Sequence, residues 1–200
     1  MFPDYNSIAQ SIIALKDADL KLRNHLIETG QLWDGYNPEM EQLHINNANA
    51  LNTIIDLIGY PATDKVGKEA SDAAWLVIQH AISLPDFMKR CAVVLEEAVA
   101  ENKAGFINLA YLKDRIAVFE GNPQQYGTQF DWDEDGKMSP SPFDDLHKVN
   151  ERRKAAGLNL LEEQTAIIRA RAESEKAPTP KDLAHRKQQT DAWRKKVGWI

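Results

Sequence analysis

The sequence contains a single cysteine, Cys91, and no long uninterrupted hydrophobic run. One cysteine excludes an internal disulfide framework and any metal or iron–sulfur site built from several cysteines. No stretch reaches the roughly 18–20 apolar residues that a bilayer-spanning helix needs, and the first residues lack the basic start of a signal peptide. We therefore expect a cytoplasmic protein without membrane contact, stabilised by the packing of a hydrophobic core.

Several familiar catalytic motifs are also missing. The sequence has no Gly-rich phosphate-binding loop, no Gly-x-Ser-x-Gly elbow and no dinucleotide-binding fingerprint. The zinc-binding pattern His-Glu-x-x-His is absent as well. The sequence therefore predicts neither a metal nor a cofactor.

Charge is distributed unevenly along the chain. Residues 1–150 contain 12 Lys and Arg against 23 Asp and Glu, a net charge of −11, whereas residues 151–200 contain 12 against 7, a net charge of +5. An acidic body disfavours binding to nucleic acid, so we expect no nucleic-acid partner. The basic end is expected to fold back on the acidic body or to contact an acidic partner.

Apolar residues recur at steps of three and four, which predicts a mainly α-helical fold. We expect an irregular helical bundle with a short β-hairpin and a helical C-terminal extension. The hairpin lies within residues 123–142, with strands over 128–132 and 137–139, because Asp135-Gly136 supplies a tight turn. The predicted helices cover residues 7–29, 38–58, 68–82, 85–102, 107–120, 144–156, 160–175 and 180–196. We expect a helical domain over residues 1–161 and a basic extension over 162–200.

A few polar residues fall on helix faces that are otherwise apolar. His44 and Asn47 lie on the apolar stripe of the second helix, and Gln79 and His80 interrupt the apolar run of the third. Burying such groups is costly unless they pair with one another or with a ligand. We therefore predict that His44 and His80 lie close together, with a carboxylate or guanidinium from the fifth helix within reach. The residues of that helix that border the protein core are Asp114 and Arg115.

Two motifs resemble a known family. They are Ala-Ala-Trp-Leu-x-x-Gln-His-Ala at residues 73–81 and Glu-Gly-x-Pro-Gln-x-Tyr-Gly-Thr-Gln at residues 120–129. With residues 44–48 and 112–116, they resemble an uncharacterised bacterial family known only as a domain of unknown function, over about residues 7–161. The resemblance implies that the suspected buried polar residues are among the signature positions, and it implies no activity, cofactor or catalytic residue.

The polar residues favour a small enzyme of the hydrolase or transferase type that acts on a polar small molecule or a peptide. An imidazole can serve as acid, base or metal ligand near neutral pH, so His80, His44 and Asp114 are the predicted catalytic residues. A two-histidine, one-carboxylate metal site with Asp114 or Glu120 is a further alternative. The predicted ligand-binding residues are Asn47, Gln79, Arg115, Gln124, Tyr126 and Gln129, with residues 124–129 walling a pocket beside His80.

Two other readings remain open. The polar cluster also fits a non-catalytic binding or protein-interaction module whose polar core is structural. Residues 178–200 are expected to form a helix docked through Leu183, Trp193 and Trp199. This helix would pack either on the acidic body or on a second copy of the chain, and the second arrangement would give a homodimer through the C-terminal helix.

Overall fold

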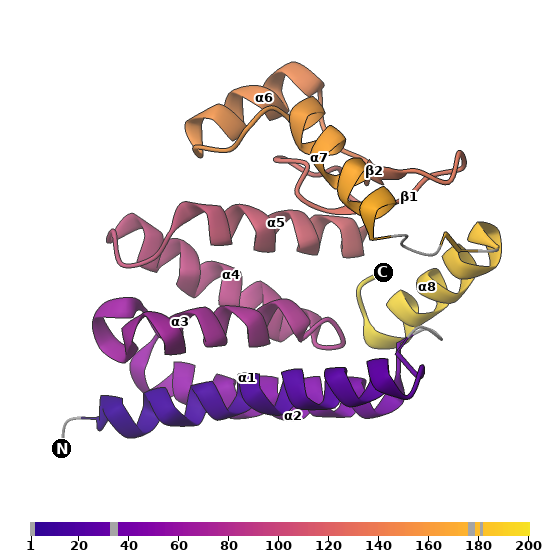
Figure 1. Cartoon of the computed structure of the whole chain (residues 1–200). Helices are drawn as coiled ribbons and strands as arrows, with labels where there is room; N and C mark the ends of the chain where they lie inside the picture. Colours follow the sequence, from indigo (N-terminus) through magenta and orange to yellow (C-terminus); the bar gives the residue numbers. More distant parts are fainter. Residues whose placement is uncertain (1–2, 33–35, 176–178, 181) are drawn as a thin grey trace. The chain divides into compact units, whose positions relative to one another are not determined.

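The computed structural model describes residues 3–32, 36–175, 179–180 and 182–200. Within these residues it contains eight helices and one two-stranded antiparallel sheet (Figure 1). The predicted fold class, mainly α-helical with a short hairpin and a C-terminal helix, is therefore confirmed. The chain divides into two compact units, residues 1–105 and 106–200. The predicted boundary after residue 161 stays a prediction.

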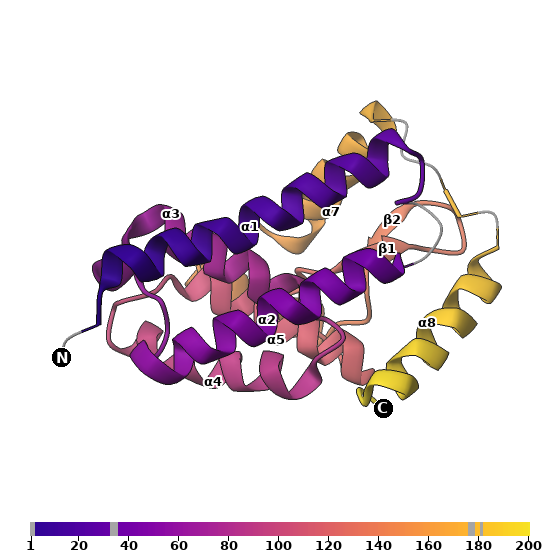
Figure 2. The same cartoon turned by 90° about the horizontal axis from the view of Figure 1, so that it is seen from below.

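The first unit consists of α1 (Tyr5–Glu28), α2 (Pro38–Ile58), α3 (Thr63–His80) and α4 (Pro85–Ala100). Helix α1 lies beside both α2 and α3 (Figures 1 and 2). It runs antiparallel to α2, because Leu15 contacts Asn47 and Asp19 contacts His44. It runs parallel to α3, because Lys16 contacts Glu69 and Asp19 contacts His80, which lies further along α3.

Local sequence signals set the ends of these helices. Asn37 caps α2 by accepting hydrogen bonds from the backbone N–H groups of Glu39 and Met40, and Pro38 occupies the first turn as expected. Helix α3 begins at Thr63 rather than at residue 68. A kink at Gly67, whose φ of +78° is in the left-handed region, joins a short preceding turn to the predicted helix.

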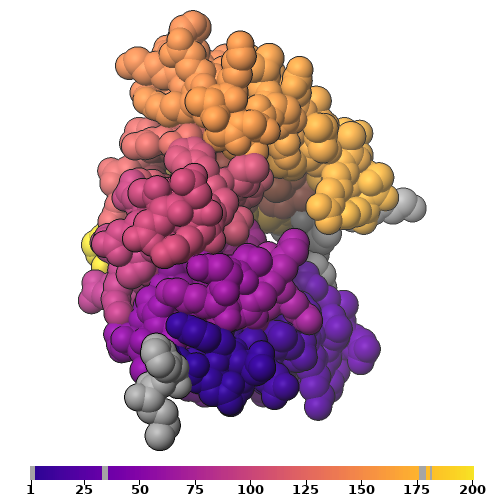
Figure 3. Space-filling view, turned by 90° about the vertical axis from the view of Figure 1, so that its left-hand side faces the viewer, coloured from indigo at the N-terminus to yellow at the C-terminus, as the bar shows by residue number. Residues whose placement is uncertain are grey.

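The core of the first unit is formed by apolar side chains from all four helices. Fully buried members include Ile12, Leu51, Ile78 and Leu95. Cys91 is also fully buried, and burial raises the pKa of its thiol to about 12. This matches the expectation of a core thiol rather than a nucleophile. Figure 3 shows the indigo atoms of α1 directly beside the purple atoms of the helices that follow it.

The second unit consists of α5 (Phe106–Glu120), β1 (Phe130–Trp132), β2 (Met138–Pro140), α6 (Leu146–Ala155), α7 (Leu161–Ser174) and α8 (Leu183–Val197). In the hairpin, Phe130 pairs with Pro140 and Trp132 with Met138. Asp133 stabilises the turn by accepting hydrogen bonds from the backbone N–H groups of residues 135 and 137. The predicted hairpin is therefore confirmed, with a first strand that begins at residue 130 rather than 128 and a second strand shifted by one residue.

The C-terminal helix packs on the end of α5. The Trp199 ring stacks on Phe119 at a centroid distance of 5.1 Å, and Trp193 contacts the same ring edge-on at 5.7 Å. Arg194 donates a hydrogen bond to the Phe119 carbonyl. Trp193 and Trp199 thus dock as predicted, whereas Leu183 is only half-buried. Residues 176–178 and 181, at the predicted start of this segment, lie outside the described residues, and the homodimer stays a prediction.

Helix length and hydropathy also bear on membrane contact. Over the described part of the chain, no helix combines the length and apolar character required to cross a bilayer.

Candidate functional site

Three polar side chains from three helices of the first unit meet at one point. His80 Nδ1 lies 2.8 Å from Asp19 Oδ2, and His44 Nε2 lies 2.9 Å from the same oxygen. The two imidazole ring centroids are 4.9 Å apart. The prediction that His44 and His80 lie close together is confirmed. The carboxylate that contacts them is Asp19, and we call these three residues the Asp–His cluster.

Sequence reasoning missed Asp19, although a signal for it is present. The apolar residues of α1 recur at 8, 12, 15, 22 and 26, and position 19 fills the gap in this three- and four-residue spacing. Asp19 therefore points to the core between Ile12 and Leu26, and all three are buried. A charged residue on the inward face of an amphipathic helix is a stronger indication of a site than a lone histidine.

Asn47 holds α1 in position beside the cluster. Its side-chain amide donates a hydrogen bond of 3.0 Å to the Leu15 carbonyl, which belongs to the same helical turn as Asp19. Asn47 lies about one turn from His44 on α2 and is buried. This predicted ligand-binding residue therefore contacts the protein backbone, where it fixes the register of α1 against α2.

A chain of hydrogen bonds continues from His44 toward the surface. His44 Nδ1 lies 2.6 Å from the Tyr36 hydroxyl, which in turn hydrogen-bonds with Ser83. Ser83 donates to Glu41 Oε1 at 2.5 Å. Glu41 precedes His44 by three residues, so this pair has the Glu-x-x-His spacing typical of helical metal sites. That short motif is a second signal that sequence reasoning missed.

The cluster strongly favours an ionised carboxylate. Burial opposes ionisation of Asp19, but the adjacent His44 and His80 imidazoles outweigh it and hold the pKa of this carboxyl well below its usual range. Burial, with smaller contributions from the charges of Glu41 and Asp19, raises the pKa of Tyr36. The Tyr36 phenol therefore stays protonated across the physiological range.

Solvent reaches the cluster through one of its members. The side chain of His80 is 30% exposed, whereas those of His44 and Asp19 are 9% and 1% exposed. An open depression of about 490 Å³ lies along α1 and α3, and its residues nearest the cluster, Lys16 and Leu76, are one helical turn from Asp19 and His80. It is lined by Lys16, Lys68, Glu69, Asp72 and Leu76.

Asp114 belongs to the second unit and organises a loop there. Its carboxylate accepts hydrogen bonds from the backbone N–H groups of Gln125, Tyr126 and Thr128, and from the Thr128 hydroxyl. Burial raises the pKa of Asp114, while these backbone hydrogen bonds oppose the shift. The contacts of Asp114 are those of a residue that fixes the loop of residues 124–129, and its predicted catalytic role stays a prediction.

The other predicted residues of the second unit bond to one another. Arg115 Nε donates to Gln129 Oε1 at 3.1 Å, and the Gln124 side chain bonds both backbone groups of Gln129. Tyr126 packs edge-on against Phe106 at a centroid distance of 5.8 Å. These contacts account for the amide-rich sequence of the loop. The expectation that residues 124–129 border His80 stays a prediction. Gln79, the remaining predicted ligand-binding residue, belongs to the first unit and is buried.

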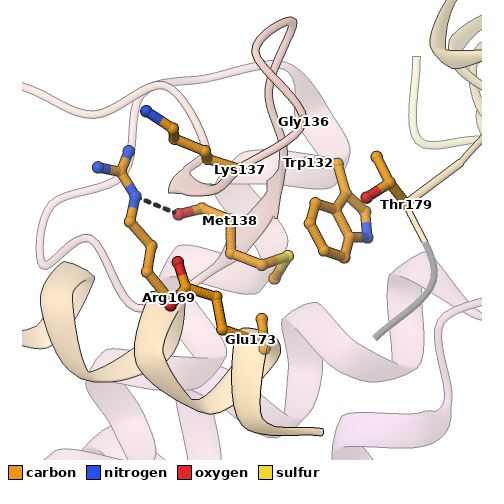
Figure 4. A pocket seen from close by; sticks show the side chains of 8 residues that line it. Trp132, Gly136, Lys137, Met138, Arg169, Glu173 and Thr179 are labelled. Carbon is orange, nitrogen blue, oxygen red and sulfur yellow. Dashed lines mark hydrogen bonds between the residues drawn. The ribbon is translucent and has the colours of Figure 1, made fainter. Parts of the chain in front are cut away.

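A smaller pocket lies between the hairpin and α7 (Figure 4). Its volume is about 190 Å³, and Arg169 donates a hydrogen bond from Nε to the Met138 carbonyl at its edge. Arg169 also approaches Asp133 at 3.8 Å, so its charge is already balanced by the protein. None of the residues that line this pocket was predicted as a site residue, and none is a histidine or cysteine.

Comparison with known proteins supports the part of the sequence resemblance that concerns a family of unknown function. No curated protein and no solved structure matches the chain. A family described as "Family of unknown function (DUF6624)" matches residues 6–174. This segment contains Asp19, His44, His80 and Asp114, whereas α8 lies beyond it. Because the match covers most of the chain, the protein belongs to the DUF6624 family.

Proposed function

We propose that the protein is an enzyme of the hydrolase or transferase type, with its catalytic centre at the Asp–His cluster of Asp19, His44 and His80. The observation that carries the proposal is one buried carboxylate contacting two imidazoles, of which one is 30% exposed. A buried charge is costly, so a protein retains such an arrangement where it serves chemistry or where its partners fully compensate it. The accessible His80 edge is where a substrate would meet the cluster.

The surroundings of the cluster favour a polar substrate. The neighbouring depression is lined by two ion pairs, Lys16–Glu69 and Lys68–Asp72, along the α1–α3 groove. Ligand sites usually combine apolar walls with a few placed polar groups, and here Leu76 is the apolar contribution. A small polar molecule or a peptide end fits this lining, and the cluster would activate water or a substrate hydroxyl as nucleophile.

A non-catalytic binding module is the second candidate. It is favoured by Asn47 and by the loop of residues 124–129, since these predicted ligand-binding groups hydrogen-bond to the protein itself. In that case the Asp–His cluster maintains the structure, and the protein would release a bound molecule without converting it chemically.

The experiment that separates the two candidates compares the full-length protein with His80→Gln. Both are incubated with a panel of small esters, phosphomonoesters, amides and dipeptides, and mass spectrometry follows conversion and retention. We expect the wild type to convert at least one class, and His80→Gln to lower the rate about 10²–10⁴-fold, as loss of an acid–base group does. His25→Gln, an exposed histidine on α1, should retain the wild-type rate.

The outcomes are distinct. A compound retained by the protein without conversion would favour the binding module. Equal rates for the wild type and His80→Gln, or no conversion in the whole panel, would contradict the proposed enzyme centre.

A further inference from the structure

The Tyr36 hydroxyl lies 2.6 Å from His44 Nδ1. Ser83 donates its hydroxyl proton to the Glu41 carboxylate. In the neutral imidazole one nitrogen donates and the other accepts. When His44 Nδ1 donates to the Tyr36 hydroxyl, His44 Nε2 presents a lone pair.

This lone pair faces the carboxylate of Asp19. The distance between His44 Nε2 and Asp19 Oδ2 is 2.9 Å, yet the contact lacks hydrogen-bond geometry. The second carboxylate oxygen, Oδ1, is buried and has no hydrogen-bond partner among the described residues. Two acceptors held this close in a buried site repel each other unless a positive charge lies between them.

A proton on His44 does not resolve the conflict. It would balance the charge, but His44 Nε2 has no hydrogen-bond partner among the described residues. It would also leave Asp19 Oδ1 buried without a partner. A metal ion would resolve both, since it accepts electron pairs from each atom at once. The third donor is His80 Nδ1, and the three ligand atoms lie within 4.8 Å of one another.

We propose that Asp19, His44 and His80 bind a divalent transition-metal ion of the zinc type, through the carboxylate, His44 Nε2 and His80 Nδ1. Ligand atoms about 2.0–2.1 Å from a tetrahedral zinc ion are roughly 3.3 Å apart. The two N–O separations of 2.8 and 2.9 Å need to open by roughly half an ångström to reach this geometry. Imidazole and carboxylate ligands together favour zinc-like ions over magnesium or calcium.

The residues beyond the donors support the same assignment. A metal-binding histidine commonly donates its other ring N–H to a partner that fixes the ring and the tautomer. The Tyr36 hydroxyl lies 2.6 Å from His44 Nδ1, where it can accept this proton, and Ser83 and Glu41 lie beside Tyr36. These three are positioning residues. From the sequence, a metal site was only an alternative, with Asp114 or Glu120 as the carboxylate, because the donors come from three separate helices, which no single short motif spans.

Three protein ligands leave one coordination position for water or substrate, which is typical of catalytic rather than structural zinc sites. His80 borders solvent, so the open position can be reached from outside. Zinc lowers the pKa of bound water to about 7 and so supplies a nucleophile at neutral pH. This catalytic role rests on the proposed function, whereas binding of the ion does not.

The test is zinc binding to the chelator-treated, full-length protein, measured by titration calorimetry. We expect one zinc ion per chain. Asp19→Asn, His44→Gln and His80→Gln should each weaken binding by at least about 10²-fold, and Tyr36→Phe by about 10–100-fold, as loss of an outer partner does. Asp17→Asn and His25→Gln, exposed neighbours on the same helix, should bind like the wild type.

Cobalt supplies an independent measurement. Co²⁺ bound by two imidazoles and a carboxylate should give visible absorption bands that His80→Gln loses and that excess Mg²⁺ does not remove. Circular dichroism checks that each variant is folded. If a variant at the buried positions 19 or 44 does not fold, the comparison rests on His80→Gln, whose side chain is only partly buried, and on Tyr36→Phe.

Each outcome bears on a different proposal. Absence of stoichiometric zinc binding, or binding that His80→Gln leaves unchanged, would overturn the metal site. Zinc binding without any conversion in the substrate panel would retain the metal site and remove the proposed enzyme. Conversion by the chelator-treated protein without zinc binding would retain the enzyme and remove the metal.

Discussion

The carboxylate of Asp19 is the residue on which the site depends most. It is buried on the inward face of α1, where it replaces an apolar side chain, and both imidazoles contact it. Its ionised form is strongly favoured by those neighbours despite burial. Removing either histidine would leave this carboxylate less compensated, so the three residues depend on one another.

The Asp19 carboxylate should make stability depend on acid pH. Its pKa in the folded protein lies below the ordinary value of 3.8, so the unfolded chain binds the proton first as the pH falls. The resulting contribution to the free energy of unfolding is complete above that ordinary value and is lost progressively below it. We expect the wild type to lose more stability than Asp19→Asn between about pH 5 and pH 3 in urea titrations.

Asp17→Asn is the matched control for this measurement, because Asp17 lies on the same helix with a side chain that is 64% exposed. It should retain the wild-type pH dependence. Equal acid sensitivity of the wild type and Asp19→Asn would show that the imidazoles do not lower the pKa of the carboxyl.

Sequence reasoning predicted the two histidines and overlooked their carboxylate, although the spacing of α1 contains a signal for it. His44 and His80 interrupt apolar faces, and periodicity alone places them inward. Asp19 interrupts such a face too, but α1 carries many charges, and an acidic residue among them resembles the solvent side. Tyr36 and Ser83 lie outside the helices, where periodicity gives no information about side-chain direction.

At the scale of elements, the helices were predictable because their apolar spacing and their caps agree. Helix α2 begins at Pro38 after the Asn37 cap and ends before Gly59, as its sequence indicates. The start of α3 was not predictable in the same way. A glycine at position 67 indicates the end of a helix, whereas α3 continues through Gly67 with a kink. Pairing between elements depends on tertiary contacts that a single sequence does not display.

One element contact gives a sharp stability prediction. Gly127 has a φ of +62°, and a Cβ atom there would lie 2.7 and 2.9 Å from the two Cδ atoms of Leu161 on α7. Leu161 is buried. We therefore expect Gly127→Ala to lower the free energy of unfolding by about 1–3 kcal/mol, through overpacking and backbone strain. Chemical denaturation measures the change.

A control and a double variant separate the two causes. Gly157 has a φ of +72° with open space around it, so Gly157→Ala reports the backbone strain alone and should cost less. Leu161→Ala makes room for the added methyl group, so the effects of Gly127→Ala and Leu161→Ala should be less than additive. Strict additivity would show that the close approach carries no energy.

At the scale of the whole molecule, residues 183–200 lie outside the family match but contact the rest of the second unit through aromatic rings. Trp199 is 5% exposed and stacks on Phe119, and Arg194 bonds the Phe119 carbonyl. Burial of apolar area stabilises by about 25 cal/mol per Å². The segment therefore acts as part of the fold of residues 106–200.

Deleting residues 183–200 should consequently lower the thermal midpoint. The deletion exposes Phe119 and removes both tryptophans, and a loss of 1 kcal/mol shifts the midpoint of a protein this size by about 2–4 °C. Because the aromatic contacts lie within one chain, we expect the solution mass to fall only by the deleted peptide. Scanning calorimetry and light scattering measure the two quantities.

Two results would change this interpretation. An unchanged midpoint would mean that α8 contributes nothing to stability. A mass that falls to one half would favour the homodimer in which the C-terminal helix is exchanged between copies.

The positions of the three Asp–His cluster residues along the chain also determine when the cluster can form during protein synthesis. Its three members come from α1, α2 and the last residue of α3. A nascent chain that has emerged only through α2 holds two of the three, and neither a complete ligand set nor a shared carboxylate is available. The cluster thus arises only after residue 80 has left the ribosome and α3 has packed beside α1, whereas the core is complete only once α4, at residues 85–100, has followed.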